Sequence, residues 1–198
     1  MVDDAHGIGV LGANGRGSLE HFGMTPDDVP VLVGTLGKAL GSFGAFVAGS
    51  HDLIEYLIQK SRPYIYTTAL PQPVAAATRK ALEISQRERW RRERVLALTA
   101  RFRKAAHAAG IPLMNPDGLN SPATPIQPVV LGSSEAALGV QQALLRAGFR
   151  VIAIRAPTVA RGSERLRITL SAAHTEEQVD GLVEALARVT EQTATEQQ

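Results

Sequence analysis

The apolar and polar positions in the first part of the chain predict short strands and one amphipathic helix. Residues 31–36 (VLVGTL) and 44–49 (GAFVAG) are apolar runs that predict two short buried strands. Residues 26–30 (PDDVP) predict a turn that leads into the first of these strands. Ser50 is a candidate N-cap, and the apolar stripe after it predicts a helix that ends before Pro63.

The middle of the chain predicts one long helix. Residues 64–69 (YIYTTA) are β-forming residues in a short segment bounded by prolines. A helical pattern then covers residues 71–109, and Gly110 with Pro112 ends it. Residues 115–125 are rich in Pro, Asn, Ser and Gly, which predicts a loop.

The last part of the chain predicts a small α+β domain. Arg165–Ser171 alternates polar and apolar residues, as a half-buried strand does. Thr175 and Gln178 have the spacing of a capping box at the start of the last helix. The full predicted order is a strand at 126–131, a helix at 134–147, strands at 151–155 and 165–171, and a helix from 175 to about 189. We therefore divide the chain into residues 1–91 and a small α+β domain of residues 92–198.

Composition narrows the class of protein. The chain has 198 residues with 44% hydrophobic and 20% charged residues, which is ordinary for a globular protein. It contains no cysteine, which excludes disulfides, a thiolate zinc site and a cysteine nucleophile and fits a reducing cytoplasm. The net charge of +2 calls for no nucleic-acid partner, and no apolar run approaches the roughly 18 residues of a membrane span. The acidic start of the sequence predicts no signal peptide.

Lys38 is the first candidate for chemistry, because it lies among glycines between the two predicted strands. Low-dielectric surroundings lower the pKa of a lysine, and a partly neutral amine is what a Schiff-base lysine requires. The alternative is a solvated loop lysine, since lysines are mostly exposed. A phosphate-binding P-loop is excluded, because Leu32 and Ala39 stand where that motif needs Gly and Ser or Thr.

Asp3 and His6 are the second candidates. Their D-x-x-H spacing at a strand end can place both side chains on one rim, but two ligands are too few for a metal site. Gly7, Gly9 and Gly12 complete a G-x-G-x-x-G pattern, although no amphipathic helix follows it. This pattern is therefore only a weak indication of dinucleotide binding.

The arginine-rich run at 87–94 (RERWRRER) has two interpretations. A nucleic-acid surface is one of them, because the run combines basic residues with a tryptophan. Glutamates interrupt the arginines, however, and interspersed charges of both signs are typical of a solvated helix face. We favour the solvated helix face.

Three stretches in this order resemble the α-oxoamine synthases, a family of pyridoxal-phosphate enzymes. They are VDDAHGIGVLGANGRGS (2–18), GTLGKALGSFGAFVAG (34–49) and IRAPTVARGSERLRITLSAAH (154–174), and YIYTTALP (64–71) supports them. The resemblance implies an α/β fold: the C-terminal part of the large domain of an aspartate-aminotransferase-like, fold type I transferase, followed by a small α+β domain.

The resemblance also implies roles for particular residues. Lys38 would form the Schiff base with pyridoxal 5'-phosphate. Asp3 would face the pyridine nitrogen and keep it protonated. His6 would hydrogen-bond the phenolic oxygen of the ring, and Thr35 would offer its hydroxyl to the phosphate.

Further roles involve the substrate and a second subunit. Thr67 and Thr68 are similar to the pair that reaches the phosphate of a neighbouring subunit, which implies a homodimer. Thr158 is similar to a residue on the substrate side. Arg167 would bind the carboxylate of the amino acid, for which its planar fork is suited. The alternative for Arg167 is a surface arginine on a strand.

Within the family, the resemblance is to members that condense L-alanine with a pimeloyl thioester of coenzyme A or acyl carrier protein, with decarboxylation, in biotin biosynthesis. Glycine C-acetyltransferase and 5-aminolevulinate synthase share the same residue pattern and remain alternatives. The first half that the family possesses has no counterpart here. An inactive fragment is therefore a further alternative, and we expect the chain alone to bind cofactor weakly and to turn over little or nothing.

Overall fold

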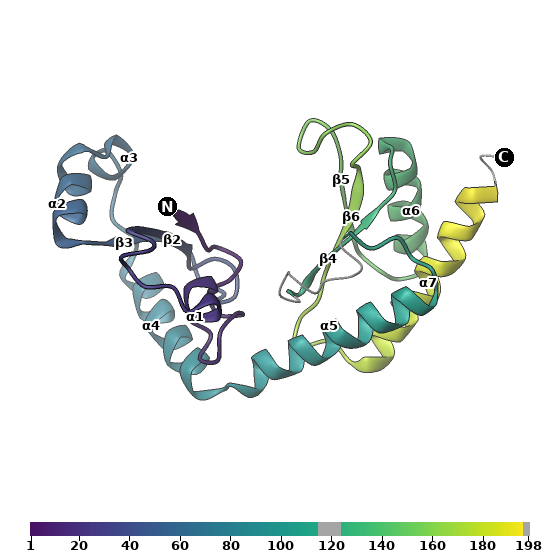
Figure 1. Ribbon diagram of the computed structural model, residues 1–198, viewed down its shortest axis with the longest axis horizontal. Coiled ribbons are helices and arrows are strands. Elements are labelled where there is room, and N and C mark those ends of the chain that lie inside the picture. Colours follow the sequence, from purple (N-terminus) through teal and green to yellow (C-terminus); the bar gives the residue numbers. More distant parts are fainter. Residues whose placement is uncertain (115–123, 196–198) are drawn as a thin grey trace. The chain divides into compact units, whose positions relative to one another are not determined.

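The computed structural model describes residues 1–114 and 124–195, and side chains as far as residue 190. The chain divides into two compact units, Met1–Arg92 and Glu93–Gln198 (Figure 1). Most of the loop predicted at 115–125 lies outside the described residues.

Unit 1 contains a three-stranded sheet in the order β1-β2-β3. Its strands are β1 (Val2–Asp3), β2 (Val31–Thr35) and β3 (Ala45–Gly49), so both strands predicted from the apolar runs are confirmed. β1 runs parallel to β2, and β3 runs antiparallel to β2. Parallel strands end at the same edge of a sheet. The segments that follow β1 and β2 therefore leave the sheet at one edge.

Four helices belong to unit 1: α1 (Ser18–Phe22), α2 (His51–Lys60), α3 (Arg62–Ile65) and α4 (Gln72–Arg87). The predicted N-cap is confirmed, since the Ser50 hydroxyl accepts a hydrogen bond from the Leu53 amide at 3.3 Å. The segment of β-forming residues forms no strand. Its start is the turn of helix α3, in which the Tyr64 and Ile65 amides donate to the Ser61 carbonyl, and Pro63 is suited to a first helical turn.

The long helix predicted over residues 71–109 is wrong as a single element. It is two helices, α4 and α5 (Trp90–Ala108), separated at Glu88 and Arg89. Arg92 explains the interruption: its side chain is buried and donates to the Ser85 carbonyl at 2.6 Å, which satisfies a carbonyl in the last turn of α4. A continuous helix would place this carbonyl opposite the amide of Arg89 instead.

Unit 2 contains an antiparallel sheet in the order β4-β6-β5. The strands are β4 (Ile126–Val130), β5 (Ile152–Ile154) and β6 (Arg165–Thr169), and the helices beside them are α6 (Ser134–Arg146) and α7 (Glu176–Thr195). The predicted capping box is confirmed, since the Gln178 amide donates to the Thr175 hydroxyl and the Thr175 amide donates to the Gln178 side chain. α7 extends past the expected end at residue 189.

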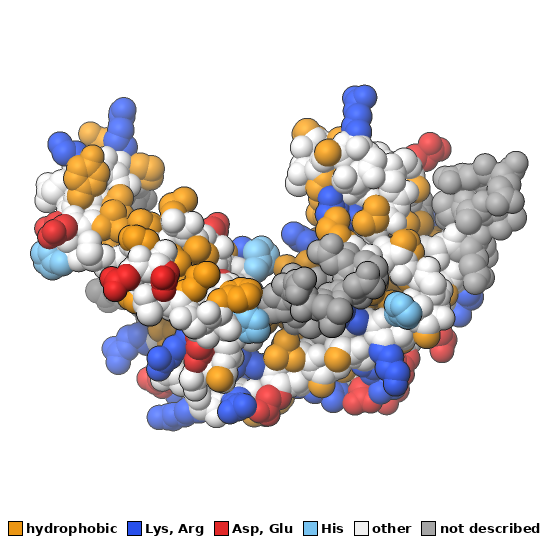
Figure 2. Space-filling view, viewed as in Figure 1, with side chains coloured by type: hydrophobic (Ala, Val, Ile, Leu, Met, Phe, Trp, Pro, Cys, Tyr) orange, Lys and Arg blue, Asp and Glu red, His pale blue; other side chains and the backbone are white. Residues whose placement is uncertain are grey.

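The described buried apolar side chains are distributed unequally between the two units. Twenty of them belong to unit 2, where Phe102, Leu144, Leu166 and Leu186 are completely buried, and three belong to unit 1. The apolar residues exposed in unit 1 lie partly on and beside β3, α2 and α3, where apolar side chains gather in Figure 2. They include Phe43, Val47, Tyr56, Tyr64, Ile65 and Tyr66. Unit 2 has a hydrophobic core of its own, whereas unit 1 leaves apolar surface uncovered.

The burial expected for the strands of unit 1 is therefore wrong. β2 is mostly half-buried, and four of the five residues of β3 are exposed. The physical reason is that no described segment covers this part of β3. A strand in a partly parallel sheet normally has both faces covered, which is why its sequence reads as a continuous apolar run.

Candidate active site

Asp3 lies at the edge of the sheet where β1 and β2 both end. It is paired with Val33 in the parallel register, and the following amide, that of Asp4, donates to the Val33 carbonyl at 2.8 Å. The Asp3 side chain is exposed, and one of its carboxylate oxygens accepts the Ala5 amide at 3.0 Å. This bond holds the carboxylate against the turn that leads to His6, which is also exposed.

The buried carboxylate of Asp4 organises the turn after β1. It is 3% exposed and accepts two hydrogen bonds from Ser18, at 2.8 Å from the amide and 2.5 Å from the hydroxyl. The Asp4 carbonyl accepts the amides of Gly7 and Ile8. A Cβ on Gly7 or Gly17 would overlap this carboxylate, so both positions require glycine. The sequence analysis did not single out Asp4.

A second carboxylate, Glu20, holds the rest of the glycine-rich loop. It accepts the Asn14 and Arg16 amides and the Asn14 side chain at distances of 2.6 to 3.2 Å. The hydrogen bond from the Arg16 amide is the main cause that lowers the pKa of Glu20. These amides are already bound by a carboxylate of the same chain. The structure therefore gives no support to dinucleotide binding by this loop.

Lys38 lies in a closed loop between β2 and β3, over residues 36–44. The Leu36 amide donates to the Gly44 carbonyl at 2.9 Å, and the Gly41 amide donates to the Lys38 carbonyl at 3.0 Å. Thr35 closes the base of the loop, because its hydroxyl donates to the Gly44 carbonyl at 3.1 Å and accepts the Gly37 amide at 3.2 Å.

Lys38 itself is exposed, which differs from the burial that the sequence analysis expected. Gly37 and Ala39 on either side of it are exposed as well, so no described segment covers this part of the loop. The Thr35 hydroxyl, expected to bind the phosphate, is already engaged in a hydrogen bond within the protein. Its single proton is directed at the Gly44 carbonyl, so donation to a phosphate requires that this bond be released.

Close packing brings the glycine-rich loop and the Lys38 loop together. A Cβ on Gly9 would lie 2.6 Å from the Cβ of Ala39, the residue next to Lys38. A Cβ on Gly34 would lie 2.6 Å from Ile8 Cδ1. The turn after β1 therefore packs against both the end of β2 and the loop that follows it. Asp3 and Lys38 thus belong to two segments that touch.

Thr67 and Thr68 are exposed in the connection between α3 and α4. Leu70, two residues further on, packs near the Lys38 loop: its Cδ1 would lie 3.1 Å from a Cβ on Gly44. This segment therefore passes the end of the Lys38 loop within unit 1.

Thr158 and Arg167 belong to unit 2. Thr158 is exposed in the connection between β5 and β6. Arg167 is exposed on β6, opposite Pro128 of β4 and Ile152 of β5. Leu166 and Ile168 beside it are buried, so Arg167 points to the face of the sheet away from the core.

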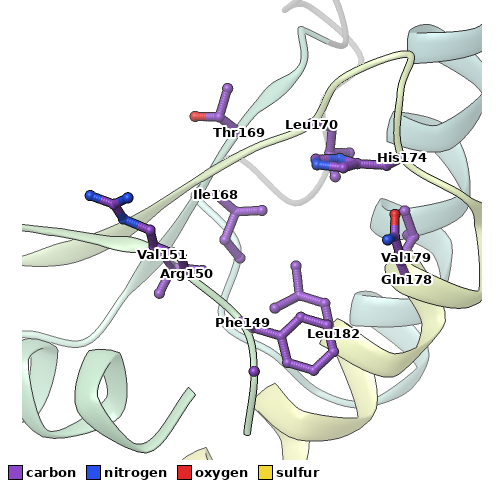
Figure 3. A pocket seen from close by; sticks show the side chains of 11 residues that line it. Phe149, Arg150, Val151, Ile168, Thr169, Leu170, His174, Gln178, Val179 and Leu182 are labelled. Atoms are coloured by element: carbon purple, nitrogen blue, oxygen red, sulfur yellow. The ribbon is translucent and has the colours of Figure 1, made fainter. Parts of the chain in front are cut away.

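A pocket of about 340 Å³ in unit 2 contains none of the candidate residues. It lies between the end of β6, the segment before β5 and the start of α7, and apolar side chains such as Phe149, Ile168 and Leu182 line it (Figure 3). Arg150, Thr169, His174 and Gln178 supply polar groups around it.

The arginine-rich run is mostly a solvated surface, as expected, with Arg92 as the exception. Arg91 forms an ion pair with Glu88 at 2.6 Å and stacks over Trp90 at 4.7 Å. No group of three or more His, Asp or Glu residues suited to a metal ion occurs within residues 1–114 and 124–195. In the same described part of the chain, no helix is long and apolar enough to cross a membrane.

Comparison with known proteins assigns the family. The family described as aminotransferase class I and II matches residues 1–186. The chain therefore belongs to the aminotransferase class I and II family, whose members depend on pyridoxal phosphate. The expected α/β fold type I class is confirmed, since the structural relatives are pyridoxal-phosphate enzymes of that type.

Individual relatives refine this assignment. The chain is 58% identical over 194 residues to 8-amino-7-oxononanoate synthase of Cellvibrio japonicus, covering 98% of this chain and 47% of the relative. The crystal structure of 8-amino-7-oxononanoate synthase from Francisella tularensis has a TM-score of 0.85 at 30% identity, covering 98% of this chain and 55% of that one. Serine palmitoyltransferase of Sphingomonas wittichii has a TM-score of 0.86 at 30% identity, covering 98% and 47%. The chain spans about half the length of the curated relatives it matches.

Proposed function

We propose that this chain provides the Schiff-base lysine and the ring partners of a pyridoxal-phosphate-dependent acyltransferase. The reaction is the condensation of L-alanine with a pimeloyl thioester of coenzyme A or acyl carrier protein to 8-amino-7-oxononanoate in biotin biosynthesis, with loss of carbon dioxide and release of the free thiol. The observation that carries the proposal is the packing of the Asp3–His6 turn against the loop that holds Lys38. The 58% identity to 8-amino-7-oxononanoate synthases supports the choice of reaction.

The residues present fit the cofactor chemically. Asp3 offers an exposed carboxylate, which favours the protonated form of a pyridine nitrogen beside it. His6 would offer a hydrogen bond to the phenolic oxygen, and Lys38 would hold the aldehyde carbon through its amine. When bound, pyridoxal phosphate supplies an electron sink for charge that develops on the α-carbon of the amino acid.

The other candidates act on substrate and phosphate. Once its amine is released from the aldehyde carbon, Lys38 would remove the proton from the α-carbon of alanine, which is general-base catalysis by a positioned amine. Arg167 binds the carboxylate of alanine with its guanidinium fork, and Thr158 contacts the substrate. Thr67 and Thr68 would bind the phosphate in a neighbouring subunit of a homodimer, and Thr35 would bind the phosphate in its own subunit after its bond to the Gly44 carbonyl is released.

The open surface of unit 1 limits what this chain does alone. Lys38, Asp3 and His6 are all exposed, and water competes for each polar group that a substrate or cofactor needs. We infer that the half of the relatives that this chain does not match covers the site. The chain alone is therefore expected to bind the cofactor weakly and to show little or no turnover.

Co-production with the N-terminal half of the Cellvibrio japonicus relative, which this chain does not match, tests the proposal. The assay measures thiol release from a pimeloyl thioester with L-alanine or with glycine, with and without added pyridoxal phosphate. We expect turnover with L-alanine that requires both halves and disappears in Lys38→Ala. The proposal is wrong if Lys38→Ala is as active as the unmodified pair.

The same assay separates the alternatives within the family. A preference for glycine with an acetyl or succinyl thioester indicates a glycine C-acetyltransferase or a 5-aminolevulinate synthase instead. Absence of turnover from both the single chain and the pair, despite a folded complex, indicates an inactive fragment. The cytoplasmic location stays a prediction.

A further inference from the structure

The loop that carries Lys38 has a composition that permits many conformations. It contains Gly37, Gly41 and Gly44, and the φ angles of the last two are +61° and +109°. Glycine loses more conformational freedom on ordering than any other residue. A lysine that must meet one carbon atom of a planar ring nevertheless needs one loop conformation. The structure must therefore hold this loop from outside.

A hydrogen bond between two hydroxyl groups ties the loop to helix α4. The hydroxyls of Ser42 and Thr78 lie 2.6 Å apart, and Thr78 is 9% exposed. Thr78 donates its own proton to the Val74 carbonyl at 2.8 Å. Because a hydroxyl has a single proton to donate, Ser42 is the donor to Thr78. The bonds form a chain from the loop through Thr78 to the backbone of α4.

Ser42 transmits this contact to the turn at Lys38. Its amide donates to the Leu36 carbonyl at 2.8 Å, at the start of the loop. The residue before it, Gly41, donates its amide to the Lys38 carbonyl at 3.0 Å. The turn from Lys38 to Gly41 therefore lies between Leu36 and Ser42, which are hydrogen-bonded to each other. Holding Ser42 in place restrains the conformation of this turn.

We propose that Ser42 and Thr78 are positioning residues for Lys38. They hold the loop at 36–44 in the conformation from which the amine of Lys38 reaches the aldehyde of pyridoxal phosphate. Neither side chain is assigned a contact with cofactor or substrate, and both act through the loop. This inference rests on the proposed function, in which Lys38 is the Schiff-base lysine.

Local hydrogen exchange in the full chain tests the anchor without any cofactor. We expect Thr78→Val and Ser42→Ala each to speed amide exchange over residues 36–44 roughly three- to tenfold, the range that one net hydrogen bond allows. The double variant is expected to exchange no faster than either single variant, because both changes break the same bond. Thr78→Ser keeps the hydroxyl, so amide exchange over residues 36–44 is expected to stay as slow as in the unmodified chain.

Thr99→Val is the matched control. Thr99 is a buried threonine of α5 whose hydroxyl donates to the Val95 carbonyl at 2.8 Å, the same intrahelical bond that Thr78 makes. It lies in unit 2, so its loss is expected to leave exchange over residues 36–44 unchanged. Equal acceleration in Thr99→Val and Thr78→Val, or none in Thr78→Val, overturns the proposal.

Borohydride trapping with pyridoxal phosphate supplies the second measurement. The readout is the share of phosphopyridoxyl adduct on Lys38, compared with the other lysines Lys60, Lys80 and Lys104. We expect this share to fall roughly three- to tenfold in Thr78→Val and to stay unchanged in Thr99→Val. If Thr78→Val retains the Lys38 share, the positioning role is wrong, while the proposed function is unaffected. Lack of any preference for Lys38, also in the pair with the N-terminal half of the Cellvibrio japonicus relative, overturns the proposed function as well.

Discussion

Two adjacent aspartates, Asp3 and Asp4, are expected to respond very differently to replacement by alanine. Asp4→Ala removes a buried carboxylate that accepts the amide of Ser18 at 2.8 Å and its hydroxyl at 2.5 Å. Asp3→Ala removes an exposed carboxylate with a hydrogen bond to the Ala5 amide. Asp4 should therefore determine the stability of the turn, and Asp3 should determine cofactor chemistry.

The magnitude follows from the two bonds. A hydrogen bond to a charged group contributes about 1.5 to 3 kcal/mol, and water that enters the opened turn recovers part of the loss. We expect Asp4→Ala to destabilise the turn of unit 1 by about 3 kcal/mol, which corresponds to roughly a hundredfold faster amide exchange over residues 4–18. Ser18→Ala keeps its amide but loses the hydroxyl bond to the carboxylate, and it is expected to cost about 1.5 kcal/mol.

Hydrogen exchange measured by mass spectrometry on peptides of both units is the assay. Asp4→Ala should accelerate exchange in the turn and leave the buried segment around Phe102 in unit 2 unchanged. Asp3→Ala should change exchange in the turn no more than a few-fold, yet abolish the preference of pyridoxal phosphate for Lys38. Similar exchange rates in the two variants would show instead that the buried carboxylate does not hold the turn.

Three further predictions concern packing and pH. Gly34→Ala should destabilise unit 1 by about 1 to 3 kcal/mol, because its Cβ would lie 2.5 Å from Phe46 Cζ. Hydrogen exchange measures this loss, and an unchanged exchange rate would contradict the packing. Phe102→Ala should lower the stability of unit 2 by about 3 to 5 kcal/mol in urea unfolding, since the ring is completely buried, and a loss below about 1 kcal/mol would contradict that burial. The hydrogen bond from Arg101 lowers the pKa of Asp180, so its stabilising contribution is present above about pH 4 and is lost as the pH falls through the lowered pKa. Asp180→Asn should flatten this acid limb in thermal unfolding, and an unchanged limb would rule the pair out as its cause.

The elements that the sequence predicted correctly depend on local signals. The apolar run before Lys38 forms β2, and the Ser50 N-cap and the Thr175–Gln178 capping box form as expected, because each signal acts within a few residues. The interruption at Glu88 had no such signal. It depends on the buried side chain of Arg92, and burial is a property of the folded unit.

The candidate site stays a prediction, but its surroundings could be predicted in part. The family motifs point to Lys38 and Asp3, whereas the exposure of Lys38 depends on which segments cover its loop, and no local pattern encodes this. The burial of Asp4 could have been predicted. Side chains alternate between the two faces of a strand, which places Asp4 on the same face as the half-buried Val2 and opposite Asp3. The pairing of Ser42 with Thr78 had none, because the two residues are 36 positions apart.

The most direct test of the central claim is to find which lysine pyridoxal phosphate modifies. The chain is incubated with pyridoxal phosphate, reduced with borohydride and mapped by peptide mass spectrometry. We expect a phosphopyridoxyl adduct mainly on Lys38, and we expect it to be lost in Asp3→Ala and in competition with excess pyridoxine phosphate. An adduct spread evenly over Lys38, Lys60, Lys80 and Lys104 would show instead that the Lys38 loop and the Asp3 turn form no cofactor site.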